Sequence, residues 1–242
     1  MDPEYGRRYR ELHRRHWWWR ARERVILKTL ERLTPAEGFG RILDVGCGDG
    51  LLFPHLSRLG AVEGIEPDAD IVTRAETAHG RIHVRPFDAT FRPEARYGLI
   101  LMLDVLEHLD DPDAAARQVR DLLEPNGLLL VTVPALGWLW TAHDVLNEHR
   151  TRYERGALVR LLQAAGLGVE QARYHFRWMV PAKLVLRAKE RVLGGEPRVP
   201  RVPPVLLNRL LYGVSRAEDA VLGWSVTLPG SSLLAVARRA EA

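Results

Sequence analysis

Short apolar runs alternate with amphipathic segments along most of the chain. The apolar runs are rich in Val, Ile and Leu and end at glycine, proline or a carboxylate, which is typical of strands buried in a sheet. We predict strands over 41–47, 61–67, 81–89, 97–105, 128–134, 168–176 and 231–239. Between them the pattern predicts helices over 50–59, 68–80, 111–124 and 154–165. Strands separated by helices favour parallel pairing, so we expect an α/β fold with a doubly wound, mostly parallel sheet of seven strands.

Three stretches lie outside this alternation, namely 1–38, 135–153 and 177–230. We expect four parts in the chain: an N-terminal helical lid over 1–38, an α/β core over 39–176, a helical insertion or cap over 177–230, and the last core strand with a tail over 231–242. The segment 205–222 has helical spacing. Its apolar face consists of Val205, Leu206, Leu210, Val214, Ala217 and Val221.

Composition fits one large domain with insertions, since the chain has 242 residues of which 46% are hydrophobic. The single cysteine, Cys47, excludes an intramolecular disulfide, which fits a reducing cytoplasm. The first residues carry no apolar segment of a secretory signal, and no window approaches the ~18 uncharged apolar residues of a membrane span. We therefore expect a cytoplasmic protein.

Positive charge is concentrated in two regions, although the net charge is only +4. Residues 1–28 carry nine Arg or Lys against four Asp or Glu, and residues 177–216 carry nine against two. Such local excess indicates an anionic partner, such as a phosphate, a nucleic acid or an acidic membrane surface. The alternative is that these residues only form solvated helix faces.

The first predicted strand runs into a glycine loop, ILDVGCGDG, with Gly46, Gly48 and Gly50 spaced G-x-G-x-G. Glycines let the backbone turn tightly and approach a ligand closely. A dinucleotide-binding loop would place its third glycine one position later, where this chain has Leu51.

Carboxylates end the next two predicted strands. Glu66 is about 20 residues beyond the loop, where an acid can accept hydrogen bonds from ribose hydroxyls, and Asp88 ends the third strand. Open α/β sheets bind ligands at this edge. The alternative is that Glu66 caps a helix and Asp88 a turn.

The stretches ILDVGCGDG, GIEPD, FDA, MLDVLEHLDDP and LLEPNGLLLVTVP, in this order, resemble class I S-adenosylmethionine-dependent methyltransferases. The resemblance covers residues 40–176 and is strongest to the small-molecule branch that includes the ubiquinone O-methyltransferases. Nucleic-acid amino-methyltransferases carry an (N/D/S)-P-P-(Y/F) tetrapeptide where this chain reads LMLDVLEH. The resemblance implies a Rossmann-like sheet with an antiparallel last strand, S-adenosylmethionine as cofactor and S-adenosylhomocysteine as product.

The resemblance also implies a set of cofactor-binding residues. Gly46, Gly48 and Gly50 would lie under the methionine moiety. Glu66 would bind the ribose, Asp88 with Ala89 the adenine, and Leu103 would lie beside the cofactor. Asp44 could face the α-ammonium group, and Arg20 or Arg22 could reach the carboxylate, with Arg22 favoured. The full expected set is Arg22, Asp44, Gly46, Cys47, Gly48, Gly50, Glu66, Pro67, Asp88, Ala89 and Leu103.

A polar loop over 138–158 follows the fifth strand, beside the expected site of methyl transfer. His143 or His149 could act as general base, since histidine titrates near neutral pH, and Asp144 could orient it. Arg150 and Arg152 could hold an acidic or phosphorylated acceptor. The alternative is a loop whose charged groups pair locally.

Asp104, Glu107 and His108 form a D-x-x-E-H motif after the fourth strand. Some ubiquinone O-methyltransferases are thought to hold a divalent metal with an acidic pair and histidine, and oxygen-plus-imidazole ligands suit Mg²⁺, Mn²⁺ or Zn²⁺. In metal-free relatives the histidine faces the substrate. We expect no metal here and include His108 with His143, Asp144 and His149 as catalytic candidates.

Three consecutive tryptophans, Trp17–Trp19, lie in the motif HWWWRAR, which resembles a bacterial subset of the family. We expect this segment to form part of a lid whose rings pack on the sheet edge and form a wall of the acceptor pocket. Ordinary core packing is the alternative. Three successive helical residues span ~200°, so at least one ring should meet a ligand, a partner chain or lipid instead of the core.

These features predict methyl transfer from S-adenosylmethionine to a small-molecule acceptor, on oxygen, by in-line displacement. The acceptor could be acidic or lipid-linked. A nucleic-acid (RNA) methyltransferase is the weaker alternative, and a non-catalytic S-adenosylmethionine-binding protein is another. A peripheral membrane contact through 177–224, with Trp178 and Trp224, stays open, as does a homodimer.

Overall fold

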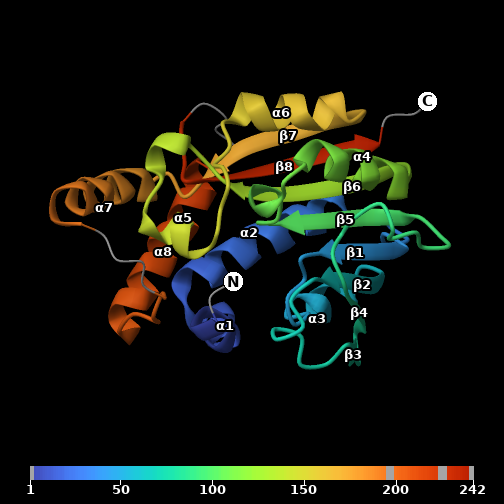
Figure 1. Cartoon of the computed structure of the whole chain (residues 1–242), viewed down its shortest axis with the longest axis horizontal. Helices are drawn as coiled ribbons and strands as arrows, with labels where there is room; N and C mark the ends of the chain where they lie inside the picture. The colour runs from blue at the N-terminus through green and yellow to red at the C-terminus, as the bar shows by residue number, and fades with distance from the viewer. Residues whose placement is uncertain (1–2, 195–198, 223–227, 240–242) are drawn as a thin grey trace.

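An eight-stranded sheet forms the centre of the protein in the computed structural model, which describes residues 3–194, 199–222 and 228–239 (Figure 1). The strands are β1 (Arg41–Val45), β2 (Ala61–Glu66), β3 (Glu76–Thr77), β4 (Gly80–Val84), β5 (Tyr97–Leu103), β6 (Leu123–Pro134), β7 (Leu167–His175) and β8 (Ser232–Arg239). Their order across the sheet is β3-β4-β2-β1-β5-β6-β8-β7. The pairs from β4 to β6 are parallel, and β8 runs antiparallel to both of its neighbours. The predicted α/β fold with an antiparallel last strand is confirmed, with β3 as an additional short edge strand.

Helices cover both faces of the sheet. The helices are α1 (Pro3–Arg15), α2 (Trp17–Leu33), α3 (Phe53–Leu56), α4 (Pro112–Leu122), α5 (Ala142–Leu146), α6 (Arg155–Ala164), α7 (Met179–Leu193) and α8 (Val205–Leu222), with single 3₁₀ turns at Leu106–His108 and Gly137–Leu139. α4 and α6 bury apolar residues on one face, and α2 and α3 on the other. β1 and β5 lie between these layers, which explains why their sequences are almost continuously apolar.

The topology gathers the remaining helices at one edge of the sheet. β5 and β6 are parallel, so their carboxyl ends meet there, and β7 ends at the same edge because β8 is antiparallel to both β6 and β7. α5 follows β6, while α7 and α8 connect β7 to β8. Together with α1 they lie around the carboxyl end of the parallel strands (Figure 1). This is the edge where open α/β sheets bind their ligands.

The helix predicted over 68–80 is wrong, because this stretch forms turns and the short strand β3. Side chains take over the backbone donors that a helix would have used. The Asp70 N–H donates to Asp68 Oδ1 at 2.9 Å, and the Thr73 N–H donates to Asp49 Oδ1 at 2.7 Å. Such side-chain acceptors compete with helix formation, and Asp49 lies too far away in sequence for a local pattern to reveal it.

Two other predicted elements are shorter than expected. The helix predicted over 50–59 is only α3, because Pro54 fits in the first helical turn alone and prevents an earlier start. The strand predicted over 81–89 ends at Val84 in β4. Pro86 lacks an N–H for the ladder, so Asp88 lies in the loop after the strand instead of at its last residue.

Candidate active site

The loop between β1 and α3 is built on three glycines with positive φ, Gly46 (70°), Gly48 (56°) and Gly50 (66°). A Cβ on Gly46 would lie 2.6 Å from Val105 Cγ2, so no larger residue fits there without displacement. The Gly46 N–H donates to Ile65 O at 2.8 Å, which ties the loop to β2. The result is a tight backbone turn at the carboxyl edge of the sheet that leaves close access to a ligand.

Glu66 ends β2 and is bonded to this loop. The Gly48 N–H donates to Glu66 Oε2 at 2.9 Å and the Asp68 N–H donates to Oε1 at 3.0 Å. Burial raises the pKa of Glu66, while these two N–H groups act to lower it. A carboxylate accepts about four hydrogen bonds, so lone pairs remain for ribose hydroxyls. Pro67 follows immediately, and the roles of Glu66 and Pro67 toward the cofactor stay predictions.

Asp44 is buried within β1, beside the glycine loop. Burial raises the pKa of Asp44 to about 7, with the charge of Arg22 acting against this and that of Glu66 adding to it. A cationic group, such as an α-ammonium, would favour the ionised form of this acid. Cys47 points elsewhere, since its Sγ lies 2.4 Å from the place of a Cβ on Gly64. Its predicted contact with the cofactor would have to come from its backbone.

The residues predicted at the adenine lie at the surface. Asp88 and Ala89 are exposed, and Asp88 Oδ1 accepts a hydrogen bond from the Thr90 N–H at 2.9 Å. The hydrogen bonds from Thr90 lower the pKa of Asp88. Leu103, the last residue of β5, is half-buried next to the same edge. The structure therefore places Leu103 beside the glycine loop's edge of the sheet, and leaves the adenine role of Asp88 as a prediction.

Tyr9 on α1 covers the glycine loop, and sequence reasoning missed it. A Cβ on Gly48 would lie 3.1 Å from Tyr9 Cε1, so the ring rests directly on the loop. Burial raises the pKa of the Tyr9 hydroxyl, and Asp44 and Glu66 add to the effect while Arg22 opposes it. Arg10, the next residue, forms a 2.5 Å ion pair with Asp49 of the loop. The aromatic residues within the predicted lid segment were the signal that could have identified Tyr9.

His16 separates α1 from α2 and caps the second helix. Its backbone is extended (ψ 134°), and its Nδ1 accepts a hydrogen bond from the Trp18 N–H at 3.1 Å. Burial lowers the pKa of His16 to about 4, so the ring is neutral and can accept this bond. His16, the residue before the three tryptophans, is therefore the N-cap at which α2 begins.

The three tryptophan rings have different neighbours. Trp17 is buried with its ring centroid 5.3 Å from that of Trp178, and Trp19 is buried against Leu12 of α1. Trp18 is only half-buried, with Phe176 6.0 Å away between ring centroids and the Arg22 guanidinium 5.8 Å away. Trp18 is thus the ring that faces the edge of the sheet. Trp224 lies outside the described residues.

Arg22 joins α2 to the ends of β5 and β6. Its Nε lies 2.8 Å from Asp104 Oδ2, and its Nη2 donates to Thr132 Oγ1 at 3.1 Å. The Thr132 hydroxyl donates in turn to Asp104 Oδ1 at 3.0 Å. Arg22 therefore neutralises a carboxylate of the protein in this state, and its predicted contact with the carboxylate of the cofactor stays a prediction. Arg20 points away, over the ring of Tyr212.

The loop after β6 brings His149 and Asp144 together. His149 Nδ1 lies 2.9 Å from Asp144 Oδ1, and the Arg152 Nε donates to the same oxygen at 3.0 Å. The ring of His149 also lies 5.0 Å from that of His108, edge to face. Burial acts to raise the pKa of Asp144, but the His149 bond and the Arg152 charge hold it well below its usual range. Of the two candidate bases, only His149 has Asp144 as a partner at hydrogen-bond distance.

His143 and the two arginines have other surroundings. His143 Nε2 lies 3.0 Å from Asn147 Nδ2, and burial lowers the pKa of His143 to about 4. Arg152 is buried and donates to two backbone carbonyls as well as to Asp144. Arg150 is exposed and pairs with Asp110 at 2.7 Å. Arg152 is therefore a structural residue of the loop, and Arg150 lies at its surface.

Glu107 is fully buried beside this cluster. Neither of its carboxylate oxygens has a hydrogen-bond partner among the described residues, and burial raises its pKa well above the usual value. Glu107, His108 and His149 each offer a ligand atom within 4.8 Å of the others, an arrangement that could hold a cation. Asp104 of the predicted D-x-x-E-H motif pairs with Arg22 instead. The three groups that lie together are therefore Glu107, His108 and His149, with His149 in the place of the motif's Asp104.

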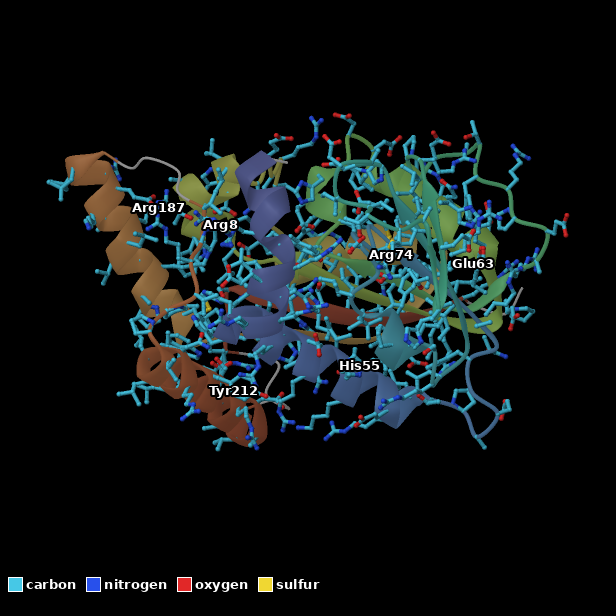
Figure 2. The ribbon with its side chains drawn as sticks, turned by 90° about the horizontal axis from the view of Figure 1, so that it is seen from below. Arg8, His55, Glu63, Arg74, Arg187 and Tyr212 are labelled. Atoms are coloured by element: carbon cyan, nitrogen blue, oxygen red, sulfur yellow. The ribbon has the colours of Figure 1, made fainter. Side chains whose placement is uncertain are left out.

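A separate cavity of about 780 Å³ lies between α1, α2, α3 and α8. Its walls carry both signs of charge, with Arg14, Arg20, Arg24 and Lys28 beside Glu23 and Glu31. Figure 2 shows two further wall residues, His55 on α3 and Tyr212 on α8. No residue of β5 or of the loop after β6 lines this cavity, so it is distinct from the His149 cluster.

The sheet order, with β8 between β6 and β7, and the glycine loop after β1 are those of the class I S-adenosylmethionine-dependent methyltransferase fold. A family model described as a methyltransferase domain matches residues 18–172, more than half of the chain, and the chain belongs to this family.

Two curated relatives are similar in sequence. The ubiquinone biosynthesis O-methyltransferase of Caulobacter sp. (strain K31) is 30% identical over 210 residues, which cover 81% of this chain and 73% of the relative. That of Rhodopseudomonas palustris (strain HaA2) is 34% identical over 105 residues, 40% of this chain. In this second match the chain spans only 41% of the relative's length.

Two solved structures share the fold. A Haloferax volcanii methyltransferase in complex with the Trm112 activator has a TM-score of 0.63 at 16% identity, over 99% of this chain and 96% of that one. The N-methyltransferase NodS of Bradyrhizobium japonicum, bound to S-adenosyl-L-homocysteine, has a TM-score of 0.54 at 16% identity, over 90% and 87%. The glycine loop, which leaves no room for a Cβ at Gly46, fits the close approach that such a cofactor requires.

Proposed function

We propose that this methyltransferase methylates a hydroxyl oxygen of a small molecule, with His149 as the base that accepts the hydroxyl proton. The observation that carries the proposal is the Asp144–His149 pair of 2.9 Å at the carboxyl end of the parallel strands. The names of the relatives, ubiquinone biosynthesis O-methyltransferases, support an oxygen acceptor. S-adenosylmethionine supplies the electrophilic methyl group when bound.

The chemistry of the pair suits a general base. The low pKa of Asp144 keeps it ionised, so it accepts the Nδ1–H of His149 and fixes the tautomer in which Nε2 carries a free lone pair. A base oriented in this way accepts a proton in the transition state and contributes roughly 10²–10⁴ in rate. Arg152 holds Asp144 in place, because it bonds both that carboxylate and the backbone carbonyl of Ala135.

Aromatic rings support a planar acceptor. Trp18 and Phe176 lie with their ring centroids 6.0 Å apart, next to the Arg22–Asp104 pair at the end of β5. Their planes are tilted by 33°, and the half-buried Trp18 offers a face on which a planar ring can stack. A phenolic hydroxyl on such a ring would also be more acidic than an alcohol, so that a histidine suffices as its base.

The roles proposed for the glycine loop, Asp44 and Glu66 concern binding of the cofactor, not proton transfer. Substitutions at His149 and Asp144 should therefore lower turnover and leave the affinity for S-adenosylhomocysteine nearly unchanged. Substitutions at the predicted cofactor residues, such as Asp44 and Glu66, should instead lower the affinity for S-adenosylhomocysteine. This difference separates the two parts of the proposed site.

The test compares His149→Ala and Asp144→Asn with His143→Ala as the matched control, since His143 lies on the same loop without a carboxylate partner. Calorimetry measures binding of S-adenosylhomocysteine, and methyl transfer is followed with catechol and related phenols as probe acceptors. We expect His149→Ala to lose at least about 100-fold in turnover, Asp144→Asn somewhat less, and His143→Ala little. Full activity in His149→Ala would overturn the assignment of the base.

A chelator tests the alternative that Glu107, His108 and His149 bind a metal ion. The proposal predicts unchanged activity in excess EDTA, because His149 acts as a base. Activity that is lost in EDTA and restored by Mg²⁺ or Zn²⁺ would assign His149, with Glu107 and His108, to a metal. Tight binding of S-adenosylhomocysteine without turnover of any hydroxylated probe would favour the non-catalytic alternative.

A further inference from the structure

α7 carries its apolar face on the outside of the protein. Val185 and Val192 are 71% and 80% exposed. Pro181, Leu184 and Ala188 are also exposed and share their face, because the spacing i, i+3, i+4, i+7 and i+11 returns to one side of a helix. No residue of this 15-residue helix is fully buried. An apolar stripe of this length therefore has no partner within the described part of the chain.

The opposite face of α7 points toward the protein and carries both apolar and polar residues, with Val180 packed against the core and Lys183 and Glu190 beside it. The Ala142 N–H donates to Glu190 Oε2 at 3.2 Å. Burial lowers the pKa of Lys183, on the same side of the helix, to about 8. Surface helices ordinarily place their apolar stripe against the core and their charges in water. α7 differs, because its apolar stripe is exposed while Lys183 and Glu190 lie toward the protein.

α8 repeats this arrangement. Leu206 and Leu210 are 81% and 62% exposed, and Val221 lies further along the same outward face. The buried residues of α8 are polar: Asn208 Oδ1 accepts a hydrogen bond from the Trp17 N–H at 2.9 Å, and the Ser215 hydroxyl accepts one from Trp178 Nε1 at 3.2 Å. The apolar face predicted for 205–222 thus exists, but it faces away from the sheet.

Charges are segregated on the two helices. Each acid of α7 and α8 has a partner toward the protein. Glu190 binds the Ala142 N–H, Glu218 accepts from the Trp178 N–H at 3.1 Å, and Asp219 pairs with Lys28 at 2.9 Å. The exposed charged residues of the two helices are basic: Lys189, Arg191, Arg209 and Arg216. The outward surface therefore combines apolar stripes with positive charge alone.

Both helices lie at the same end of the molecule, in the two perpendicular views of Figure 1 and Figure 2. This end is at the carboxyl edge of the parallel strands, where α7 leaves β7 and α8 leads to β8. None of the helices in the described ranges has the length and apolar content needed to cross a bilayer.

We propose that α7 and α8 bind the surface of a membrane that contains anionic lipids, with their apolar stripes inserted at the level of the headgroups. An apolar stripe flanked by Lys and Arg is the pattern of an interfacial helix, and anionic lipid headgroups complement the exposed basic residues. A second copy of the chain fits less well, because a twofold contact would bring these basic residues against one another. The surface does not depend on the identity of the acceptor.

Vesicle co-sedimentation tests the proposal with the full chain. Vesicles of phosphatidylcholine are compared with vesicles of equal parts phosphatidylcholine and phosphatidylglycerol. We expect binding to the anionic vesicles only. Val185→Ser and Leu206→Ser should each weaken it several-fold, and Arg191→Glu with Arg209→Glu should weaken it more than about tenfold, since each basic residue contributes about fivefold.

Matched controls use exposed residues on other elements. Val84→Ser replaces a valine on β4 that is 44% exposed, and Arg117→Glu with Arg160→Glu reverses two exposed arginines on α4 and α6. These variants should bind vesicles like the unaltered chain. Calorimetry with S-adenosylhomocysteine should give the same affinity for all variants, which separates this surface from the proposed active site.

Three outcomes would overturn the proposal. The first is that the unaltered chain does not bind the anionic vesicles. The second is that the α7 and α8 variants bind as well as the controls. The third is that light scattering shows a dimer that Val185→Ser or Leu206→Ser dissociates, with no effect on vesicle binding, which would assign the stripes to a second copy.

Discussion

Arg22 of α2 and Asp104 after β5 form a 2.8 Å ion pair at the carboxyl edge of the sheet. Asp104 has a φ of 59°, a conformation that non-glycine residues adopt uncommonly. Thr132 on β6 bonds both partners, so the pair is fixed from a third element. The helix that carries the tryptophans is in this way linked electrostatically to the strand end where the proposed site lies.

Replacing Arg22 with alanine should weaken this edge in two ways. Loss of the guanidinium leaves Asp104 half-buried without its cation, which should lower the free energy of unfolding by about 1–3 kcal/mol. If Arg22 also reaches the cofactor, the affinity for S-adenosylhomocysteine should fall about tenfold or more. Denaturation and calorimetry measure the two effects. Arg20→Ala is the control, because Arg20 is exposed over Tyr212. Unchanged affinity would restrict Arg22 to a structural role.

Glu66→Ala should weaken cofactor binding and also loosen the glycine loop. The substitution removes the acceptor of the Gly48 N–H and of the Asp68 N–H, and each lost partner of a buried donor costs about 1–3 kcal/mol. Glu66→Gln retains one acceptor oxygen and should have an intermediate effect on both stability and affinity. Titration of S-adenosylhomocysteine together with thermal unfolding checks this order. If Glu66→Ala binds as tightly as the unaltered chain, the predicted ribose contact is wrong.

Asp44 predicts a pH dependence of cofactor binding. Its pKa is raised to about 7, so the free protein holds this acid largely protonated below neutral pH. An α-ammonium bound beside it would stabilise the carboxylate, so binding should release a proton near pH 6–7 and affinity should increase as pH rises toward about 7. Calorimetry in buffers of different ionisation enthalpy counts the proton. Asp44→Asn should abolish the release. A proton count unchanged in Asp44→Asn would contradict this role.

His16 predicts sensitivity to acid. Its ring is neutral in the folded protein, with a pKa of about 4, whereas in the unfolded chain the pKa is near 6.5. Between these values only the unfolded chain binds the proton, so stability should fall as pH decreases from about 6.5 to 4. His16→Asn keeps an N-cap and should flatten this decline, while His16→Ala should cost about 0.5–2 kcal/mol at neutral pH. Urea unfolding across this pH range measures both, and an identical pH profile in His16→Asn would exclude His16 as the source.

The strands could be predicted because their burial is recorded locally in the sequence. β1 and β5 lie between two helical layers, so almost every residue in them is apolar and the run itself is the signal. The stretch 68–80 has no such apolar run. Its backbone donors are bound by side chains such as Asp49, which comes from the loop after β1. Contacts between residues far apart in sequence depend on how the chain packs, and the local pattern of apolar and polar residues does not reveal them.

The same limit applies to the candidate site. Residues at strand ends, such as Asp44 and Glu66, could be located because topology brings parallel strand ends to one edge. The choice between His143 and His149 could not be made, since both lie within five residues of Asp144 and only the path of the loop decides which ring meets it. Tyr9 was missed because its distance from the glycine loop depends on how α1 folds back over the sheet.

A chain that begins at His16 should exchange its cofactor faster while it retains its fold. α1 contacts the glycine loop through Tyr9 and Arg10. When residues 1–15 are absent, α2 keeps its cap and the residues that it buries against the sheet, such as Ile26 and Leu30, and loses the cover that Leu12 gives to Trp19. Because Tyr9 lies directly on Gly48, it must move or pack against a cofactor that enters there. We expect the dissociation rate of S-adenosylhomocysteine to rise about tenfold or more in the shortened chain and in Tyr9→Ala, by analogy with other lids that limit release. Stopped-flow fluorescence of the tryptophans measures the rate, and Arg14→Ala on the exposed side of α1 is the control. Equal rates in all four proteins would mean that α1 does not close the site.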